Sequence, residues 1–314
     1  MGILPSQVGA ASSNAGVTLG GSSPWMCVKP APAATYAANY YSDTINPDAG
    51  LRGGLPDWTF GVLHLVREHT LPVAGISGYL WDTGIGGAPP GTGHQGFWDG
   101  AGTSGDPVTG LTGKFHVNVG TDPGGSKDFT PMGAGSGPPP SSADASYSPA
   151  QQNISGGVQL TALAVDPGYT YPSTDRFWIN GRPMTGAGAP GFGGGWENSG
   201  PGGGPFKLGV DIAGSFPTSD YIIGLFLHSA VLTDEQMFLL RKNVEATRSM
   251  TDVDNIGGGV VALDHFWDVR GAGMTPGTGT AAATWTSVGA VGGIILDLTG
   301  ALDVVEVEAG FNIR

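Results

Sequence analysis

The fold is decided by the run Tyr221-Ile222-Ile223-Gly224-Leu225-Phe226-Leu227-His228 and, just beyond it, by Leu232-Thr233-Asp234-Glu235-Gln236. The first run is a continuous apolar segment of strand length, and it predicts a β-strand. In the second run, Thr233 as N-cap and Gln236 three residues later form a capping box, with Leu232 and Met237 in the staple positions. We therefore predict one helix that ends near Arg248 and packs an apolar face, Met237, Leu240 and Val244, onto a sheet.

Working outward from this region, strand-like runs are separated by segments rich in Gly and Pro. Strands are predicted over 57–66, 76–81, 113–119, 157–165, 176–179 and 206–210, and further runs at 260–267, 293–298 and 302–307. Asn180-Gly181 is a type I′ hairpin signal. The segments 83–110, 120–150 and 186–204 are predicted to be long loops, which in compact domains are usually functional or mobile.

Composition excludes several classes of protein. The chain has 57 Gly and 24 Pro residues, only 12% charged residues and a formal net charge of −13. So many helix-breaking residues are incompatible with a long helical bundle, whereas 39% hydrophobic residues fit poorly with disorder. The acidic balance argues against nucleic-acid binding, which needs a basic patch. No basic-then-apolar leader opens the chain and no long apolar run is present, so we expect neither a secretory signal nor a membrane span.

The order of the pieces between Gln159 and Lys242 resembles the concanavalin A-like, laminin-G-like jelly roll. In that family a strand ends in an Asn-Gly hairpin, and a Leu-x-Ile-Gly strand and an apolar strand follow. A short helix that begins Leu-Ser/Thr-x-x-Glu/Gln then closes the domain. Here Ile179-Asn180-Gly181, Leu208-Gly209 and Leu232-Thr233-x-x-Gln236 match. The charged residue that the family carries in its penultimate strand is replaced by Leu225-Phe226-Leu227.

This resemblance implies an all-β fold, a two-sheet antiparallel jelly-roll sandwich with one short helix and extended terminal arms. We predict an N-terminal arm at 1–24, a laminin-G-like domain at 25–250, and a C-terminal β extension or arm at 251–314. The last segment could complete the main sheets or act as a separate arm. Because arms can lie on neighbouring subunits, we expect an oligomer whose contacts run through the two terminal segments.

Carboxylates, histidines and the cysteine provide no clear catalytic or metal site. Sandwich-fold glycoside hydrolases carry a carboxylate cluster on one strand; here Glu306 and Glu308 share a strand face, which we interpret as solvated. His64 and His69 do not have the spacing of a zinc site. Asp43 and Asp48 around Asn46 are weak calcium ligands, although some laminin-G-like domains hold a single Ca²⁺ at a loop rim. Cys27, the single cysteine, is predicted to be a small buried hydrophobe.

Aromatic residues in or beside the Gly-rich segments are the remaining signal. Trp81, Trp98 and Trp196 could stack on a sugar ring, as in lectin-like modules, and Phe97 and Phe192 lie nearby. The alternative, which we favour, is that they anchor long segments onto the sandwich by burying apolar area.

Together these features predict a non-enzymatic structural protein of a virion, without cofactors. Low charge, Gly-rich loops and arms around a jelly roll resemble bacteriophage virion components. A capsid decoration or minor capsid protein is the leading interpretation, with a tail or fibre position also open. Its partners would be other virion proteins and copies of itself, with neither nucleic acid nor membrane. The alternative function is a carbohydrate-binding module that recognises a host or environmental glycan.

Overall fold

A computed structural model gives the structure of the chain. It describes residues 24–29, 41–42, 58–66, 75–83, 94–100, 114–121, 125–129, 157–165, 176–184, 206–211, 217–250, 253–255, 259–271, 274–275, 283–298 and 303–311. Of the predicted N-terminal arm 1–24, only Pro24 lies within these residues.

The described strands form two large sheets in which every strand pairing is antiparallel. Sheet A has the order β10-β9-β8-β3-β12-β1-β19, with β15 also paired to β12. Its strands are β1 (Trp25–Lys29), β3 (Trp58–Leu65), β8 (Val158–Val165), β9 (Arg176–Ile179), β10 (Arg182–Met184), β12 (Tyr221–His228), β15 (His265–Asp268) and β19 (Asp303–Val307).

Sheet B has the order β16-β17-β18-β2-β11-β4-β5-β6-β7. Its strands are β2 (Tyr41–Ser42), β4 (Gly75–Asp82), β5 (His94–Gly100), β6 (Lys114–Thr121), β7 (Gly125–Phe129), β11 (Lys207–Leu208), β16 (Met274–Thr275), β17 (Ala283–Thr286) and β18 (Ile295–Leu298). A separate hairpin pairs β13 (Val253–Asn255) with β14 (Gly259–Val261). Within the described residues, the predicted all-β sandwich with one helix is therefore confirmed.

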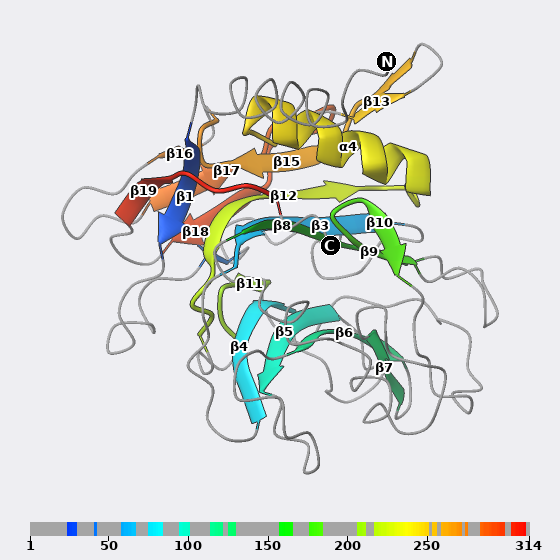
Figure 1. The fold of residues 1–314 in the computed structure, drawn as a ribbon, viewed down its shortest axis with the longest axis vertical. Coiled ribbons are helices and arrows are strands. Elements are labelled where there is room, and N and C mark those ends of the chain that lie inside the picture. Colours follow the sequence, from blue (N-terminus) through cyan, green and yellow to red (C-terminus); the bar gives the residue numbers. More distant parts are fainter. Residues whose placement is uncertain are drawn as a thin grey trace, which may run out of the picture.

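Helix α4 (Asp234–Thr247) lies over sheet A on the side opposite strands β4–β6 of sheet B (Figure 1). The predicted capping box is present: Gln236 N donates to Thr233 Oγ1, and Thr233 N donates to Gln236 Oε1. The helix ends at Arg248, as predicted, with that residue in the left-handed region. The apolar face predicted for the helix is buried, together with Arg241.

The Asn180-Gly181 turn, which joins β9 to β10, is tied to the neighbouring strand β8 and to the helix. Both residues have positive φ, 54° and 73°, as a type I′ turn requires. Asn180 exchanges two hydrogen bonds with Leu160: its backbone N donates to Leu160 O, and its side-chain Oδ1 accepts from Leu160 N, both at 2.8 Å. A Cβ at position 181 would lie 2.8 Å from Met237 O of the helix, so only glycine fits this contact.

Two of the predicted loops contain strands. The segment 83–110 includes β5, and 120–150 includes β7, so the prediction that these segments are loops throughout is wrong. β5 pairs with β6 from His94 to Asp99, and β7 pairs with β6 along its whole length. Strands in glycine-rich segments are difficult to predict from the sequence, because a glycine contributes no side chain to the two-residue alternation. The third predicted loop, 186–204, lies outside the described residues.

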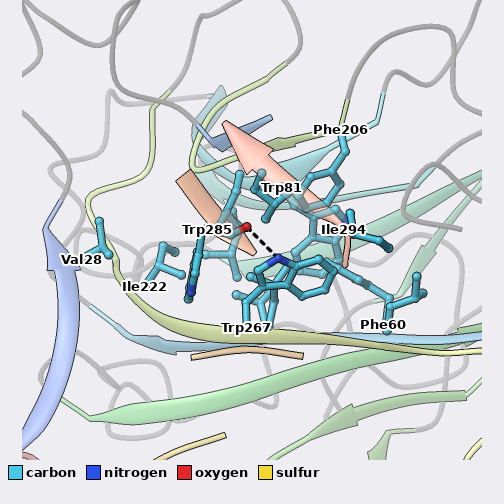
Figure 2. Close-up of a cluster of buried hydrophobic side chains, with 14 of the residues drawn as sticks. Val28, Phe60, Trp81, Phe206, Ile222, Trp267, Trp285 and Ile294 are labelled. Carbon is cyan, nitrogen blue, oxygen red and sulfur yellow. Dashed lines mark hydrogen bonds between the residues drawn. The ribbon is translucent and has the colours of Figure 1, made fainter. Parts of the chain in front are cut away.

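The inter-sheet core is rich in tryptophan and draws on both halves of the chain (Figure 2). The indole N–H of Trp267 donates to Trp285 O at 3.1 Å. These two residues come from β15 of sheet A and β17 of sheet B, so the hydrogen bond joins the two sheets inside the core. Phe60 stands edge-on to Trp81, with ring centroids 5.2 Å apart.

The C-terminal segment supplies strands to both sheets. Within 251–314, β15 and β19 belong to sheet A and β16–β18 to sheet B. Residues just after β19 are also held by β1 and by the C-terminal end of the helix at Arg248. Trp25 Nε1 and Arg248 Nη1 both donate to Ala309 O at 2.9 Å. Five described strands of this segment, β15 to β19, therefore join the main sheets, whereas β13 and β14 form the separate hairpin.

Removing one C-terminal core side chain tests this placement. We expect Trp267→Ala to lower the free energy of unfolding by about 3–5 kcal/mol, because it empties a fully buried site. The measurement is urea unfolding followed by intrinsic fluorescence. Val291→Ala, at a side chain that is 69% exposed, is the control and should stay within about 0.5 kcal/mol. An unchanged midpoint for Trp267→Ala would show that 251–314 is dispensable to the core.

Candidate functional site

Of the three tryptophans considered as possible glycan contacts, Trp81 is the one whose side chain the structure describes. Trp81 is fully buried in the inter-sheet core. Trp98 lies in β5, where it pairs with Phe115 of β6, and Trp196 lies outside the described residues. Asp43, Asn46, Asp48 and His69 also lie outside the described residues.

Trp81 packs in a way that only a glycine partner allows. It pairs with Gly96 across β4 and β5, and a Cβ on Gly96 would lie 2.3 Å from the indole ring. The ring therefore occupies the space that a side chain on β5 would need, against Phe60 on the opposite sheet. In this conformation Trp81 is unavailable to a sugar, and it anchors its strand by burial instead.

A buried polar network lies between the sheets at the start of β12. His64 Nδ1 is 2.8 Å from Asp220 Oδ2, and His64 Nε2 is 3.1 Å from Thr161 Oγ1. Gln159 Nε2 donates to Thr161 Oγ1 at 3.0 Å. All four side chains are buried. With the proton on Nδ1, His64 donates to the Asp220 carboxylate and its Nε2 accepts from the Thr161 hydroxyl, so that each of these contacts has a donor and an acceptor.

This network has the connectivity of a nucleophile–base–acid relay. A carboxylate contacts one imidazole nitrogen and a hydroxyl contacts the other, as in the serine hydrolases. Sequence reasoning found no such arrangement, because Thr161 and Asp220 lie 97 and 156 residues from His64. The hydroxyl of Thr161 is fully buried in mid-strand and is already bonded to Gln159. The arrangement as described therefore satisfies buried polar groups and offers a substrate no access.

One sequence signal for this network was available. Gln159 and Thr161 share the polar side of a strand whose other side is Val158, Leu160, Ala162 and Ala164. That pattern normally means a solvated face. Here the polar face points toward sheet B, so its groups had to find partners inside the sandwich.

A second polar group lies near the surface, at the end of β12. Asp264 Oδ2 accepts from Ser229 N at 2.7 Å and from the Ser229 hydroxyl. Burial raises the pKa of Asp264, but these hydrogen bonds and the nearby His228 and His265 outweigh it, so that the pKa lies below its usual value. Burial lowers the pKa of His228, although Asp264 lies 3.4 Å away. His228 is therefore mainly neutral at pH 7, and the pair is not a full ion pair.

Acidic residues and other candidate ligands in the described part of the chain do not gather into a metal site. Among the described residues no group of three or more His, Cys, Asp or Glu side chains could hold a metal ion. Glu306 and Glu308 are exposed, in agreement with the predicted solvated strand face. No helix in the described part of the chain is long and apolar enough to cross a membrane.

Cys27 is free and buried on β1, as predicted. Burial raises the pKa of its thiol to about 12. The thiol is therefore protonated at neutral pH, and the thiolate is the form that acts as a nucleophile or metal ligand.

Comparison with known proteins gives likenesses among solved structures. No family model matches the sequence, and no curated protein matches it. Among solved structures, the chain is similar to the native heptameric SAP-like pentraxin from Limulus polyphemus, at 9% identity and a TM-score of 0.39. The match covers 69% of this chain and 82% of the pentraxin chain.

Breaking the buried network should destabilise the fold. We expect Asp220→Ala to cost about 3 kcal/mol, because it leaves His64 buried without its carboxylate. The measurement is urea unfolding at pH 7. Glu308→Ala removes an exposed carboxylate and should cost less than about 0.5 kcal/mol. Equal effects of the two substitutions would mean that the network contributes nothing to stability.

The single thiol offers a direct test of burial. We expect Cys27 in the native chain to resist alkylation by iodoacetamide at pH 8, because its raised pKa keeps the thiolate population very small. Intact-mass measurement should show one added label once the chain is unfolded in guanidinium chloride. Rapid labelling of the native chain would contradict the buried position of β1.

Proposed function

We propose that this chain is a non-enzymatic structural subunit of a virus particle, as a capsid decoration or minor capsid protein of a bacteriophage. A tail or fibre position is the variant of the same role. The observation that carries the proposal is that four described candidates for catalysis or sugar binding are buried in the sandwich. His64, Asp220 and Cys27 are buried, and Trp81 is core.

The packing of sheet A on both of its faces supports a structural role. Sheet A is covered on one side by sheet B and on the other by α4, and each interface has its own apolar cluster. The C-terminal residues after β19 are clamped by Trp25 and Arg248, with the Arg248 guanidinium 4.8 Å from the Trp25 ring centroid. A body packed in this way keeps its shape while the subunit contacts its neighbours in the particle.

The burial of most tryptophans supports the structural role over glycan binding. Six tryptophans are fully buried: Trp25, Trp58, Trp81, Trp178, Trp267 and Trp285. Of the eight in the chain, Trp98 and Trp196 remain as candidates for stacking on a sugar. The carbohydrate-binding module considered from the sequence therefore rests on these two residues, and it is the contrasting outcome of the test below.

Mass spectrometry of gradient-purified particles tests the proposal. We expect the chain to co-purify with the particles at a constant ratio to the major capsid protein across the gradient, because a subunit has a defined number of sites. Absence from the particle fractions would contradict the structural role.

A glycan array with the purified chain reports on the contrasting function. Reproducible binding that is lost in Trp98→Ala or Trp196→Ala, and kept in Phe238→Ala at the 43% exposed aromatic of α4, would indicate a lectin-like module instead.

A further inference from the structure

The two edges of sheet A differ in how open they are to another strand. The β10 edge is three residues long and contains Pro183, which has no backbone N–H to donate. The opposite edge, β19, has five residues and no proline, and in the described part of the chain its one neighbouring strand is β1. An edge of this kind presents a row of backbone donors and acceptors to an incoming strand.

Side chains on β19 divide between the two faces of the sheet. Val305 and Val307 are half-buried and pack toward the cluster beneath α4. On the other face, Val304 is 38% exposed and Glu306 is exposed. Val304 pairs with buried Val28 of β1, so an added strand would extend an apolar row that already starts inside the sandwich.

Charge limits which strand can be added. Glu306, and Glu308 just beyond the strand, are both exposed at this edge. A second copy of the chain would bring the same carboxylates and a net charge of −13, and like charges across a strand pair are destabilising. A strand with Lys or Arg opposite Glu306 would gain from the same charges.

We propose that the β19 edge is a docking site for a basic extended segment of a different protein, which adds to sheet A as an antiparallel strand. The inference rests on the proposed structural role and names the partner chemistry for it. From the residue opposite Val307 to the residue opposite Val304, the added strand reads apolar, basic, apolar, apolar. Backbone hydrogen bonds supply affinity and the side-chain pattern supplies specificity.

The probe is a short, fluorescently labelled, amidated peptide with the core Val-Lys-Val-Val, added to the full chain. We expect saturable binding by fluorescence anisotropy, and hydrogen-exchange protection gained at 303–307. A peptide with Glu in place of Lys should bind at least about tenfold more weakly. A Val-Lys-Val-Val peptide with N-methylated backbone amides keeps the charge but not the hydrogen bonds, and it should not bind.

Charge reversals in the protein locate the site. Glu306→Lys should weaken the basic peptide about tenfold and strengthen the acidic one, and Glu306→Gln should fall between. Glu235→Lys, an equal charge change at an exposed position on α4, is the matched control and should leave both affinities nearly unchanged. Circular dichroism verifies that each variant is folded.

Four results would overturn the docking site. These are equal binding of the N-methylated peptide, equal weakening by Glu235→Lys, full protection of the β19 amides before any peptide is added, and self-association of the free chain through 303–307. Failure of peptide binding while the chain is present in purified particles removes only the β19 site. Binding of the peptide by a chain that is absent from particles removes only the virion role.

Discussion

Burial of sheet A on both faces is the constraint on which the rest of the structure depends. Sheet B covers one face and helix α4 the other, so β3 is buried along its whole length and β12 at all but its two ends. A strand covered on both sides needs apolar residues at consecutive positions rather than at alternate ones. The family that the chain resembles has a charged residue in this strand, where this chain has Leu225-Phe226-Leu227. Burial on both faces explains the difference, because Leu225 and Leu227 face the inter-sheet cluster and Phe226 faces the cluster beneath α4.

The same constraint explains the polar groups inside the sandwich. The Thr59 hydroxyl, on buried β3, donates to Ala230 O at 2.7 Å and accepts from Leu232 N at 2.9 Å, and so fixes the connection between β12 and α4. His64, also on β3, is bonded to Asp220 and Thr161. A buried donor or acceptor without a partner costs about 1–3 kcal/mol. These residues therefore hold strands together, and their polar groups are already bonded within the sandwich.

How far the sequence could predict the structure depends on whether a feature is local. The capping box of α4 and the Asn180-Gly181 turn are specified by residues close together in the chain, and both are present. The strands β5 and β7 were missed because glycine obscures alternation. Of the glycan candidates, Trp81 was visible as an aromatic beside a glycine-rich segment. The burial of Trp81 could not be predicted from the sequence, because it depends on contacts with Gly96 and Phe60. These two residues are distant from Trp81 in the chain and form no sequence pattern with it.

By itself, the sequence determined the fold class, the helix with its two ends, the hairpin turn and the buried thiol, because each depends on local propensity or simple burial. Tertiary structure alone decided that β15 to β19 join the two main sheets, that His64 meets Asp220 and Thr161, and that Trp267 bonds Trp285 across the core. These contacts join residues from separate strands, and strand order in a sheet is set by long-range pairing that leaves no periodic trace in any one segment.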